Sequence, residues 1–195
     1  MTTFQQEQNC FIAGSTWPED EAILVPYINA STASTKFVIA PHNIKSDQIL
    51  ALSKAITKRV ILYSEIADKA LEDYDVLLID TIGLLTKIYS YAHIAYVGGG
   101  FGTKGLHNTL EPAVFGIPVL IGPNYTGFKE AEDLVAQKGI VVVNSKEALE
   151  KEMTQFLSDS QHYTETGTIN SQYVDKSKGA TSLIMRHIQT IVGVL

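Results

Sequence analysis

Short apolar runs alternate with amphipathic segments along almost the whole chain, and this alternation constrains the fold more than any other feature. Most of the apolar runs are continuous and β-branched or aliphatic, without polar residues at every second position. Such runs are typical of parallel strands that helices cover on both faces. The predicted strands are Cys10–Ala13, Lys36–Ala40, Val60–Tyr63, Val76–Ile79, Ile94–Val97, Pro118–Ile121 and Ile140–Val143.

Amphipathic segments fill the intervals between these strands. The acidic run Glu19–Glu21 follows Pro18 and is interpreted as the solvated first turn of a helix. The predicted helices are Pro18–Asn29, Ser46–Thr57 with Ser46 as its cap, Ile82–Ala92, Thr109–Phe115, Phe128–Lys138, Lys146–Leu157 and Gly179–Val192. The segment His162–Lys178 has the weakest pattern and is expected to be a loop or a short helix. Together the elements predict an α/β fold, a Rossmann-like, doubly wound, mainly parallel sheet over residues 1–195.

The composition fits one ordinary globular domain. The chain has 195 residues, of which 45% are hydrophobic and 18% charged. A net charge of −6 argues against a nucleic-acid partner, although it leaves an anionic small ligand open. The N-terminal segment Met1–Asn9 lacks the apolar core of a signal peptide, and no apolar run reaches membrane-spanning length, so this piece is expected to be soluble.

Cysteine and histidine usage gives no sign of a metal site. Cys10 is the only cysteine, so it cannot form an internal disulfide and is expected to be a small buried apolar residue. The histidines lack the spacing of metal ligands, and no nucleophile motif of the G-x-S-x-G type is present. The sequence therefore predicts no metal and no cofactor.

Three polar or glycine-rich loops follow predicted strands: Gly14–Trp17, Pro41–Lys45 and Gly98–Asn108. In doubly wound sheets, ligands bind beyond the carboxyl ends of the strands, so these loops should converge on one site. Gly98–Gly105 holds five glycines in eight residues and leads into a helix, which predicts close approach of an anion to main-chain N–H groups. The structural alternative is a flexible surface loop.

The helix start after this loop carries three polar candidates. Asn108 and Glu111 have the spacing of a capping box, and capping is the expected role of Asn108. For Glu111, capping and binding of ribose hydroxyls are equally favoured by the residues alone. His107 is either a phosphate donor, a general acid or a packed residue.

The other two loops and the end of the fourth strand offer weaker signals. Either Ser15 or Thr16 is expected to cap the first long helix, and the same hydroxyls suit a phosphate. Trp17 is expected either to cover a base or sugar of the ligand, or to pack at the start of the helix. His42 is expected either to form a polar wall of the site or to be an exposed loop residue. Asp80 or Thr81 is a plausible cap for the next helix, and backbone groups near Gly83 suit the edge of a nucleobase.

With these loops, the chain resembles the C-terminal domain of the 3-deoxy-D-manno-octulosonic acid (Kdo) transferases of lipopolysaccharide synthesis. The most specific motif is Gly105-Leu106-His107-Asn108-Thr109-Leu110-Glu111-Pro112-Ala113. The other matching segments, in order, are Ala13–Glu21, Asp80–Gly83, Ala95–Gly99, Gly116–Val119 and Gly122-Pro123. Together they cover about Ala13–Val143, which is most of the chain.

The resemblance implies the donor-nucleotide domain of a GT-B glycosyltransferase, which binds CMP or CMP-Kdo and transfers Kdo to a lipid A precursor without a nucleotide-bound metal. It also implies a separate N-terminal domain, absent here, with the acceptor face, the catalytic base and the membrane anchor. No catalytic residue is therefore expected in this chain, and the full-length protein is expected at the cytoplasmic face of the inner membrane. The expected donor-binding residues are Ser15, Thr16, Pro41, His42, Ile82, Gly83, Leu84, Gly99, Gly100, His107, Asn108, Thr109, Leu110 and Glu111.

Two positions depart from the family pattern. Pro41 stands where many members have an arginine available to the phosphate, and Leu84 stands where many have a glutamate. Two other functions stay open: a GT-B domain that uses a UDP-sugar, and a non-catalytic module of flavodoxin-like shape. A comparison of the affinities for CMP and for UDP distinguishes the UDP-sugar domain from a Kdo transferase. The non-catalytic module predicts no nucleotide binding.

Overall fold

All seven predicted strands are present in the computed structural model of the chain, which describes residues 1–192. The strands are β1 (Asn9–Thr16), β2 (Thr35–Pro41), β3 (Val60–Leu62), β4 (Val76–Leu78), β5 (Ile94–Val97), β6 (Val119–Ile121) and β7 (Ile140–Val142). They form one sheet in the order β3-β4-β2-β1-β5-β6-β7, and every pair is parallel. The predicted α/β class with a mainly parallel, Rossmann-like sheet is confirmed.

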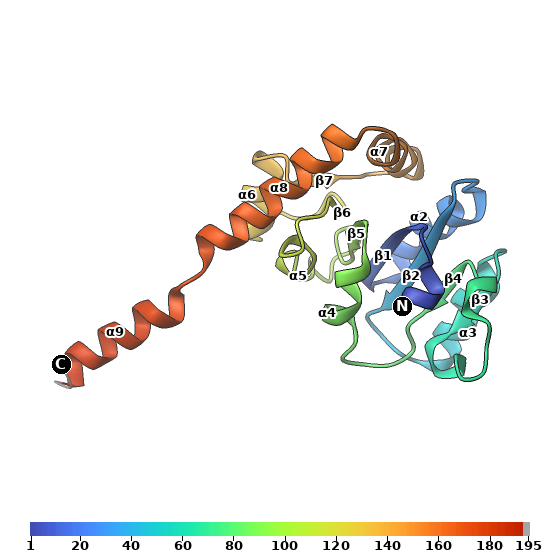
Figure 1. The fold of residues 1–195 in the computed structure, drawn as a ribbon, viewed down its shortest axis with the longest axis horizontal. Helices are drawn as coiled ribbons and strands as arrows, with labels where there is room; N and C mark the ends of the chain where they lie inside the picture. The colour runs from blue at the N-terminus through green and yellow to red at the C-terminus, as the bar shows by residue number, and fades with distance from the viewer. Residues whose placement is uncertain (193–195) are drawn as a thin grey trace.

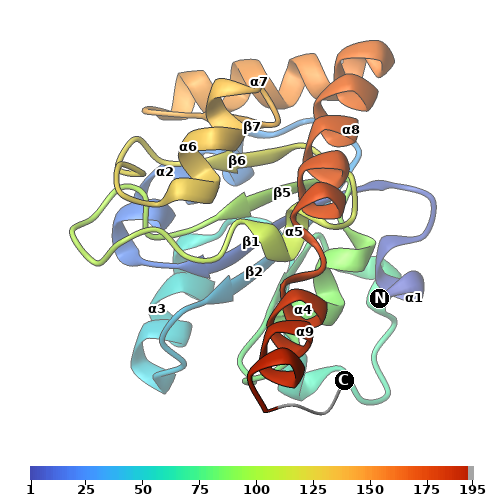
Figure 2. The same cartoon turned by 90° about the vertical axis from the view of Figure 1, so that its left-hand side faces the viewer.

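The order of the strands reverses beside β1. From β1 the chain builds one half of the sheet through β2, β3 and β4, and then crosses to the other side of β1 to add β5, β6 and β7 (Figures 1 and 2). The crevice at the carboxyl ends of β1 and β5 is therefore the topological switch point, where doubly wound folds bind their ligands.

Helices cover both faces of the sheet, because successive strand side chains point to opposite sides. Phe11 and Ala13 of β1 pack in the core under α2 (Pro18–Ala30), α3 (Ser46–Ala55) and α7 (Lys146–Ser158). Cys10 and Ile12 pack in the opposite core, under α4 (Leu85–Ile88), α5 (Leu110–Ala113), α6 (Lys129–Ala136) and α8 (Ser160–Ser177). The remaining elements are α1 (Thr2–Gln5), α9 (Ala180–Val192) and the short 3₁₀ helices η1 (Tyr63–Glu65), η2 (Leu71–Asp73) and η3 (Tyr89–Tyr91).

Cys10 has the buried position that the sequence predicts. Its side chain is almost fully enclosed, and burial raises the pKa of its thiol to about 12. A thiol in such an environment stays protonated and unreactive near neutral pH.

The prediction for His162–Lys178 is wrong, because most of this segment belongs to the 18-residue helix α8. The residues that α8 buries are Thr166, Gly167 and Asn170 rather than large apolar side chains. A Cβ at Gly167 would lie 2.1 Å from the Gly116 carbonyl oxygen, and the Asn170 amide donates to the Ile117 carbonyl at 2.7 Å. A helix that packs through small and polar residues has no strong apolar stripe, so its sequence does not show the helical period of apolar residues.

Three predicted helix starts also differ from the structure. Ser46 is the first helical residue of α3 and Lys45 occupies the cap position, so the prediction of Ser46 as the cap is wrong. The segment predicted as Ile82–Ala92 becomes helical only at Leu85, two residues after Gly83, which has a φ of 86°. Only Leu110–Ala113 of the predicted Thr109–Phe115 is α-helical.

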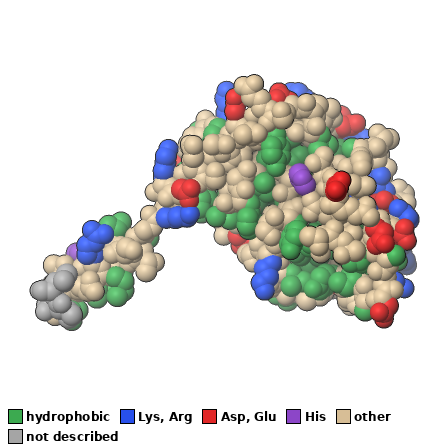
Figure 3. Space-filling view, viewed as in Figure 1, with side chains coloured by type: hydrophobic (Ala, Val, Ile, Leu, Met, Phe, Trp, Pro, Cys, Tyr) green, Lys and Arg blue, Asp and Glu red, His purple; other side chains and the backbone are tan. Residues whose placement is uncertain are grey.

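The last helix, α9, extends away from the sheet and its covering helices (Figure 1). Several of its apolar side chains are exposed, and the space-filling view shows hydrophobic atoms along it (Figure 3). Residues 1–192 include no helix with the length and apolar character needed to cross a membrane.

Candidate functional site

The three loops predicted to converge do meet at the carboxyl ends of β1, β2 and β5. Trp17, His42 and His107 each come from a different loop, and their rings are in contact. The Trp17 and His107 rings are nearly parallel with centroids 6.3 Å apart, and the indole Nε1 donates to His107 Nε2 at 3.0 Å. The His42 ring stacks on both, with centroids 4.4 Å from Trp17 and 4.5 Å from His107. Three loops from separate parts of the chain are thus held together at the switch point.

A buried carboxyl group fixes the backbone beneath these rings. Asp20 is 0% exposed and lies in the first turn of α2. Its Oδ2 accepts from the backbone N–H of Trp17 at 2.8 Å and of Gly99 at 2.9 Å, while its Oδ1 accepts from the Tyr96 hydroxyl at 2.6 Å. The expectation of a solvated acidic first turn is therefore wrong for Asp20, which ties the start of α2 to the glycine-rich loop after β5.

The glycines of this loop are required by close backbone packing. A Cβ at Gly98 would lie 2.2 Å from the Ser15 carbonyl oxygen, and a Cβ at Gly99, where φ is 94°, would lie 2.1 Å from the Gly105 carbonyl oxygen. Gly99 and Gly100 are buried, and the Gly99 N–H already donates to Asp20. Contact between these two glycines and a ligand stays a prediction, and packing alone accounts for their residue type.

The two hydroxyls of the first loop have separate roles. The Thr16 side chain is buried and donates to Glu21 Oε1 at 2.9 Å, whereas Ser15 lines a surface cavity. Burial raises the pKa of Glu21, and the hydrogen bond from Thr16 opposes that shift. Neither hydroxyl caps α2, because Trp17 holds the cap position and its N–H bonds to Asp20. The prediction of a Ser15 or Thr16 cap is wrong.

The capping box predicted at the start of α5 does not form. Thr109 is the cap residue and makes no side-chain cap bond. Asn108 instead closes a local turn, since its Oδ1 accepts from the Leu110 N–H at 3.0 Å and its amide reaches Glu111 Oε1 at 3.4 Å. The Glu111 carboxylate is thus not engaged by the backbone N–H of the cap, and it lies near enough to Tyr89 to add to the rise that burial causes in the pKa of Tyr89.

Electrostatics favour a neutral His107. Burial lowers the pKa of His107, the nearby His42 lowers it further, and the Asp20 carboxyl group opposes both. Lys104 from the same loop places its ammonium 5.9 Å from the centre of the Trp17 ring. A donor-only indole, a neutral imidazole and a lysine therefore gather at the mouth of the crevice.

Two surface cavities flank the imidazole pair. One, of about 130 Å³, includes Ser15, Pro41, His42, Ile82 and Gly83 in its lining. The second, of about 350 Å³, includes the predicted residues His107, Asn108, Thr109 and Leu110, together with Phe128, which sequence reasoning did not single out. His42 lines the first and His107 the second, and the centroids of these two stacked rings are 4.5 Å apart.

The two ends of the Ile82–Leu84 segment lie in different environments. The Ile82 side chain is 86% exposed at the rim of the smaller cavity, whereas Leu84 packs against the core. Asp80 and Thr81 cap no helix, because α4 begins after Leu84, and Asp80 instead accepts hydrogen bonds from the Ser64 N–H and hydroxyl. An exposed isoleucine among backbone groups suits the flat face of a nucleobase.

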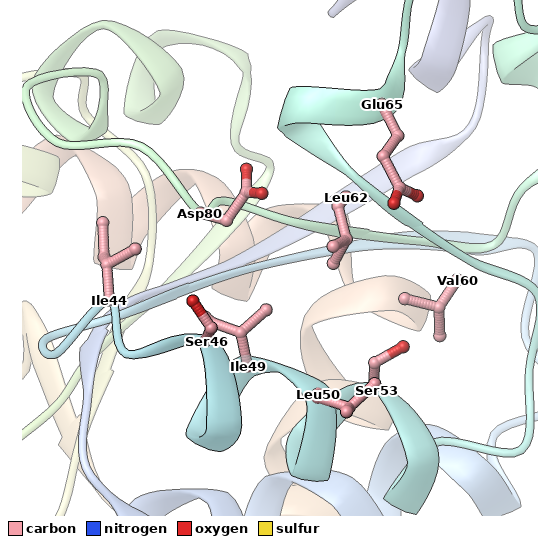
Figure 4. A pocket seen from close by; sticks show the side chains of 9 residues that line it. All are labelled: Ile44, Ser46, Ile49, Leu50, Ser53, Val60, Leu62, Glu65 and Asp80. Carbon is pink, nitrogen blue, oxygen red and sulfur yellow. The ribbon is translucent and has the colours of Figure 1, made fainter.

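A roomier cavity, of about 450 Å³, lies away from the predicted residues, between α3 and the edge strand β3 (Figure 4). Ile49, Leu50, Val60 and Leu62 form its apolar walls, and Asp80 borders it at the end of β4. It holds no histidine or glycine, and it lies off the switch point. The candidate site is therefore the crevice at β1 and β5, chosen on topology and polar groups rather than volume.

Asp20, Tyr96 and Phe128 belong to the site and were missed as site residues. The position of Asp20 three residues after the cap Trp17 is a signal for a bond to the cap backbone. Nothing in the sequence shows that the same carboxyl group also reaches Gly99 and Tyr96, since that contact depends on the pairing of β1 with β5.

No family model matches the chain, but curated relatives match it in sequence, and several of them are 3-deoxy-D-manno-octulosonic acid transferases. The 3-deoxy-D-manno-octulosonic acid transferase of Haemophilus influenzae is 28% identical over 189 residues, covering 94% of this chain and 44% of the relative. The transferase of Aquifex aeolicus is 34% identical over 152 residues, covering 75% of this chain and 41% of the relative. The chain therefore spans less than half the length of these relatives.

Solved structures match the fold. The C-terminal CMP-Kdo binding domain of WaaA from Acinetobacter baumannii superposes with a TM-score of 0.76 at 19% identity, over 89% of this chain and 92% of that domain. Anabaena HepE in complex with UDP-glucose gives a TM-score of 0.64 at 11% identity, over 96% of this chain and 49% of HepE. The comparisons confirm both the resemblance to the C-terminal part of the Kdo transferases and the GT-B type of fold.

Proposed function

Because the chain is related to the C-terminal part of the Kdo transferases, we propose that it is the donor-binding domain of a glycosyltransferase that uses CMP-Kdo. The observation that carries this proposal is the contact of Trp17, His42 and His107 at the switch point between β1 and β5. His107 belongs to the motif most specific to the resemblance, and it lies where doubly wound folds bind nucleotides.

Each part of the donor has a matching group in this arrangement. Ile82 and the backbone at Gly83 take the cytosine, with the apolar side chain against the face of the base. The Glu111 carboxylate accepts hydrogen bonds from ribose hydroxyls. His107, Asn108 and Lys104 surround the phosphate, with Lys104 supplying positive charge where Pro41 cannot.

The complete protein transfers Kdo to a lipid A precursor at the cytoplasmic face of the inner membrane, under this proposal. The proposal assigns the acceptor face and the catalytic base to a separate domain, corresponding to the part of the relatives that this chain does not match. The present chain binds donor and does not complete the transfer, so CMP and CMP-Kdo are its proposed ligands, and the lipid acceptor is a partner of the longer protein.

A UDP-sugar is the second candidate donor, since a structural neighbour was solved with UDP-glucose. Titration calorimetry of the chain with CMP, UDP, CMP-Kdo and UDP-glucose separates the two. We expect CMP and CMP-Kdo to bind, and UDP and UDP-glucose to bind at least tenfold more weakly. Tighter binding of UDP than of CMP would replace the Kdo donor by a UDP-sugar, and binding of neither would remove the donor-domain proposal.

A further inference from the structure

The hydrogen bond between Trp17 and His107 determines which nitrogen of His107 carries a proton. An indole N–H is a donor only, so the ring nitrogen that receives it, His107 Nε2, must present a lone pair. A neutral imidazole with Nε2 unprotonated has its proton on Nδ1. Within residues 1–192, Nδ1 of His107 has no hydrogen-bond partner, and His107 lines the cavity of about 350 Å³.

We infer that Trp17 is a positioning residue that fixes His107 as the neutral Nδ1–H tautomer, so that His107 offers a ligand one directed hydrogen-bond donor without positive charge. The near-parallel rings of Trp17 and His107 are those of an in-plane hydrogen bond, and the stacked His42 ring covers it from one side. Protonating Nε2 would place two N–H groups against each other, which opposes the imidazolium form.

The charged neighbours of His107 do not reverse this preference. The neighbouring His42, from the end of β2, lowers the pKa of His107, and Lys104 on the same loop as His107 lies over the Trp17 ring. Asp20 from α2 opposes this lowering, although its carboxyl group is already shared by three donors. Glu130 from α6 lines the same cavity as His107.

His93 provides an internal reference with the opposite tautomer. It lies just before β5, at the other end of that strand, and its Nδ1 accepts from the Cys10 backbone N–H at 3.1 Å. A backbone N–H is also donor-only, so His93 must carry its proton on Nε2. The side-chain amide nitrogen of Gln5 also lies 3.2 Å from His93 Nδ1, which favours the same tautomer. One protein thus contains two histidines with opposite predicted tautomers, each set by identifiable N–H groups.

Nitrogen-15 NMR of the imidazole rings tests the inference without any ligand. At neutral pH we expect His107 to be protonated at Nδ1 and His93 at Nε2. In Trp17→Phe, which keeps an aromatic ring but removes the indole N–H, the Nε2 signal of His107 should shift toward the protonated form while that of His93 stays unchanged. The His93 signal also reports whether the variant is folded. A wild-type His107 protonated at Nε2, or an unchanged His107 in a folded Trp17→Phe, would overturn the inference.

The role of His107 as a hydrogen-bond donor to a ligand rests on the proposed function. It needs a second measurement, made with CMP. The amide nitrogen of asparagine lies near the Nδ1 position of histidine, whereas that of glutamine lies near Nε2. We expect His107→Gln to weaken CMP binding by about threefold to tenfold, the scale of one hydrogen bond, and His107→Asn to weaken it less. His93→Gln should leave the affinity unchanged. Equal losses in both His107 variants would overturn the donor role, whereas absence of CMP binding by the wild type would contradict the proposed function and leave the NMR result standing.

Discussion

The carboxyl ends of β1 and β5 and the cavity between α3 and β3 are two regions of the molecule with room for a small ligand. The α3–β3 cavity has a volume of about 450 Å³, and its lining combines apolar side chains with Ser46, Ser53, Glu65 and Asp80. The site at β1 and β5 offers smaller spaces, of about 130 and 350 Å³, but three separate loops bond to one another there. We therefore base the proposed nucleotide site on converging polar groups at the switch point and not on cavity volume.

The largest expected effect concerns Asp20, the fully buried carboxyl group that organises the site at β1 and β5. Asp20→Ala leaves the Trp17 and Gly99 N–H groups and the Tyr96 hydroxyl without their acceptor. We expect the free energy of unfolding to fall by about 3–5 kcal/mol, because buried unpaired donors cost about 1–3 kcal/mol each. Urea denaturation measures this loss. Glu19→Ala, at the exposed neighbouring position, should cost less than about 1 kcal/mol, and equal losses would contradict the role assigned to Asp20.

The next effect separates the two regions by ligand affinity. Glu111→Ala should weaken CMP binding by about 1–3 kcal/mol, the scale of a lost hydrogen bond to a charged group. Glu65→Ala removes a carboxylate from the α3–β3 cavity instead and should leave the affinity for CMP unaltered. Calorimetry on both variants compares them directly. An unaltered affinity for CMP in Glu111→Ala would show that this residue has only a structural role.

The pH dependence of stability gives a smaller effect. Burial lowers the pKa of both His93 and His107 below the ordinary value of about 6.5. The unfolded chain therefore binds protons first as the pH falls, so the free energy of unfolding should decrease from about pH 6.5 down through the lowered pKa values of the folded protein. Above that range both states are neutral at these residues and their contribution is constant. Thermal unfolding between pH 7 and pH 5 should show a flatter profile in His93→Gln/His107→Gln, and an equally steep profile would contradict the assignment.

The smallest expected effect on CMP affinity comes from a change in the α3–β3 cavity, to which we assign no function. Ser53→Met lengthens a side chain that lines it, at a position in α3 where methionine suits a helix. We expect the affinity for CMP to stay within about twofold of wild type, because a change of 1.4 kcal/mol would already be tenfold. A tenfold loss would move the nucleotide site toward β3 and remove the distinction between the two regions.

Local patterns predicted the sheet because its strands are continuous buried runs. All seven predicted strands are present, and Ile94–Val97 agrees residue for residue. The convergence of the loops followed from the rule for parallel sheets, and Ser15, Pro41, His42, Ile82 and Gly83 do line one cavity. Sequence reasoning succeeds here because each step needs only the direction of a strand and the residues that follow it.

The missed features depend on contacts between distant segments. Helix α8 packs through Gly167 and Asn170 against the Gly116–Ile117 backbone, so the sequence of this helix lacks a periodic apolar pattern. Asp20 resembles any acidic residue in a first turn, and its burial arises only when β5 pairs with β1. The tautomer of His107 likewise depends on Trp17, 90 positions earlier in the chain.

Mapping of CMP contacts on the isotope-labelled chain by NMR tests the central claim most directly. The backbone amide signals of Ser15, Trp17, Gly83, His107 and Asn108 should shift on addition of CMP, while those of Leu50, Ser53 and Glu65 beside the α3–β3 cavity stay in place. UDP at the same concentration should cause smaller shifts. Shifts confined to the α3–β3 cavity, or no shifts at the ends of β1 and β5, would contradict the placement of the donor site.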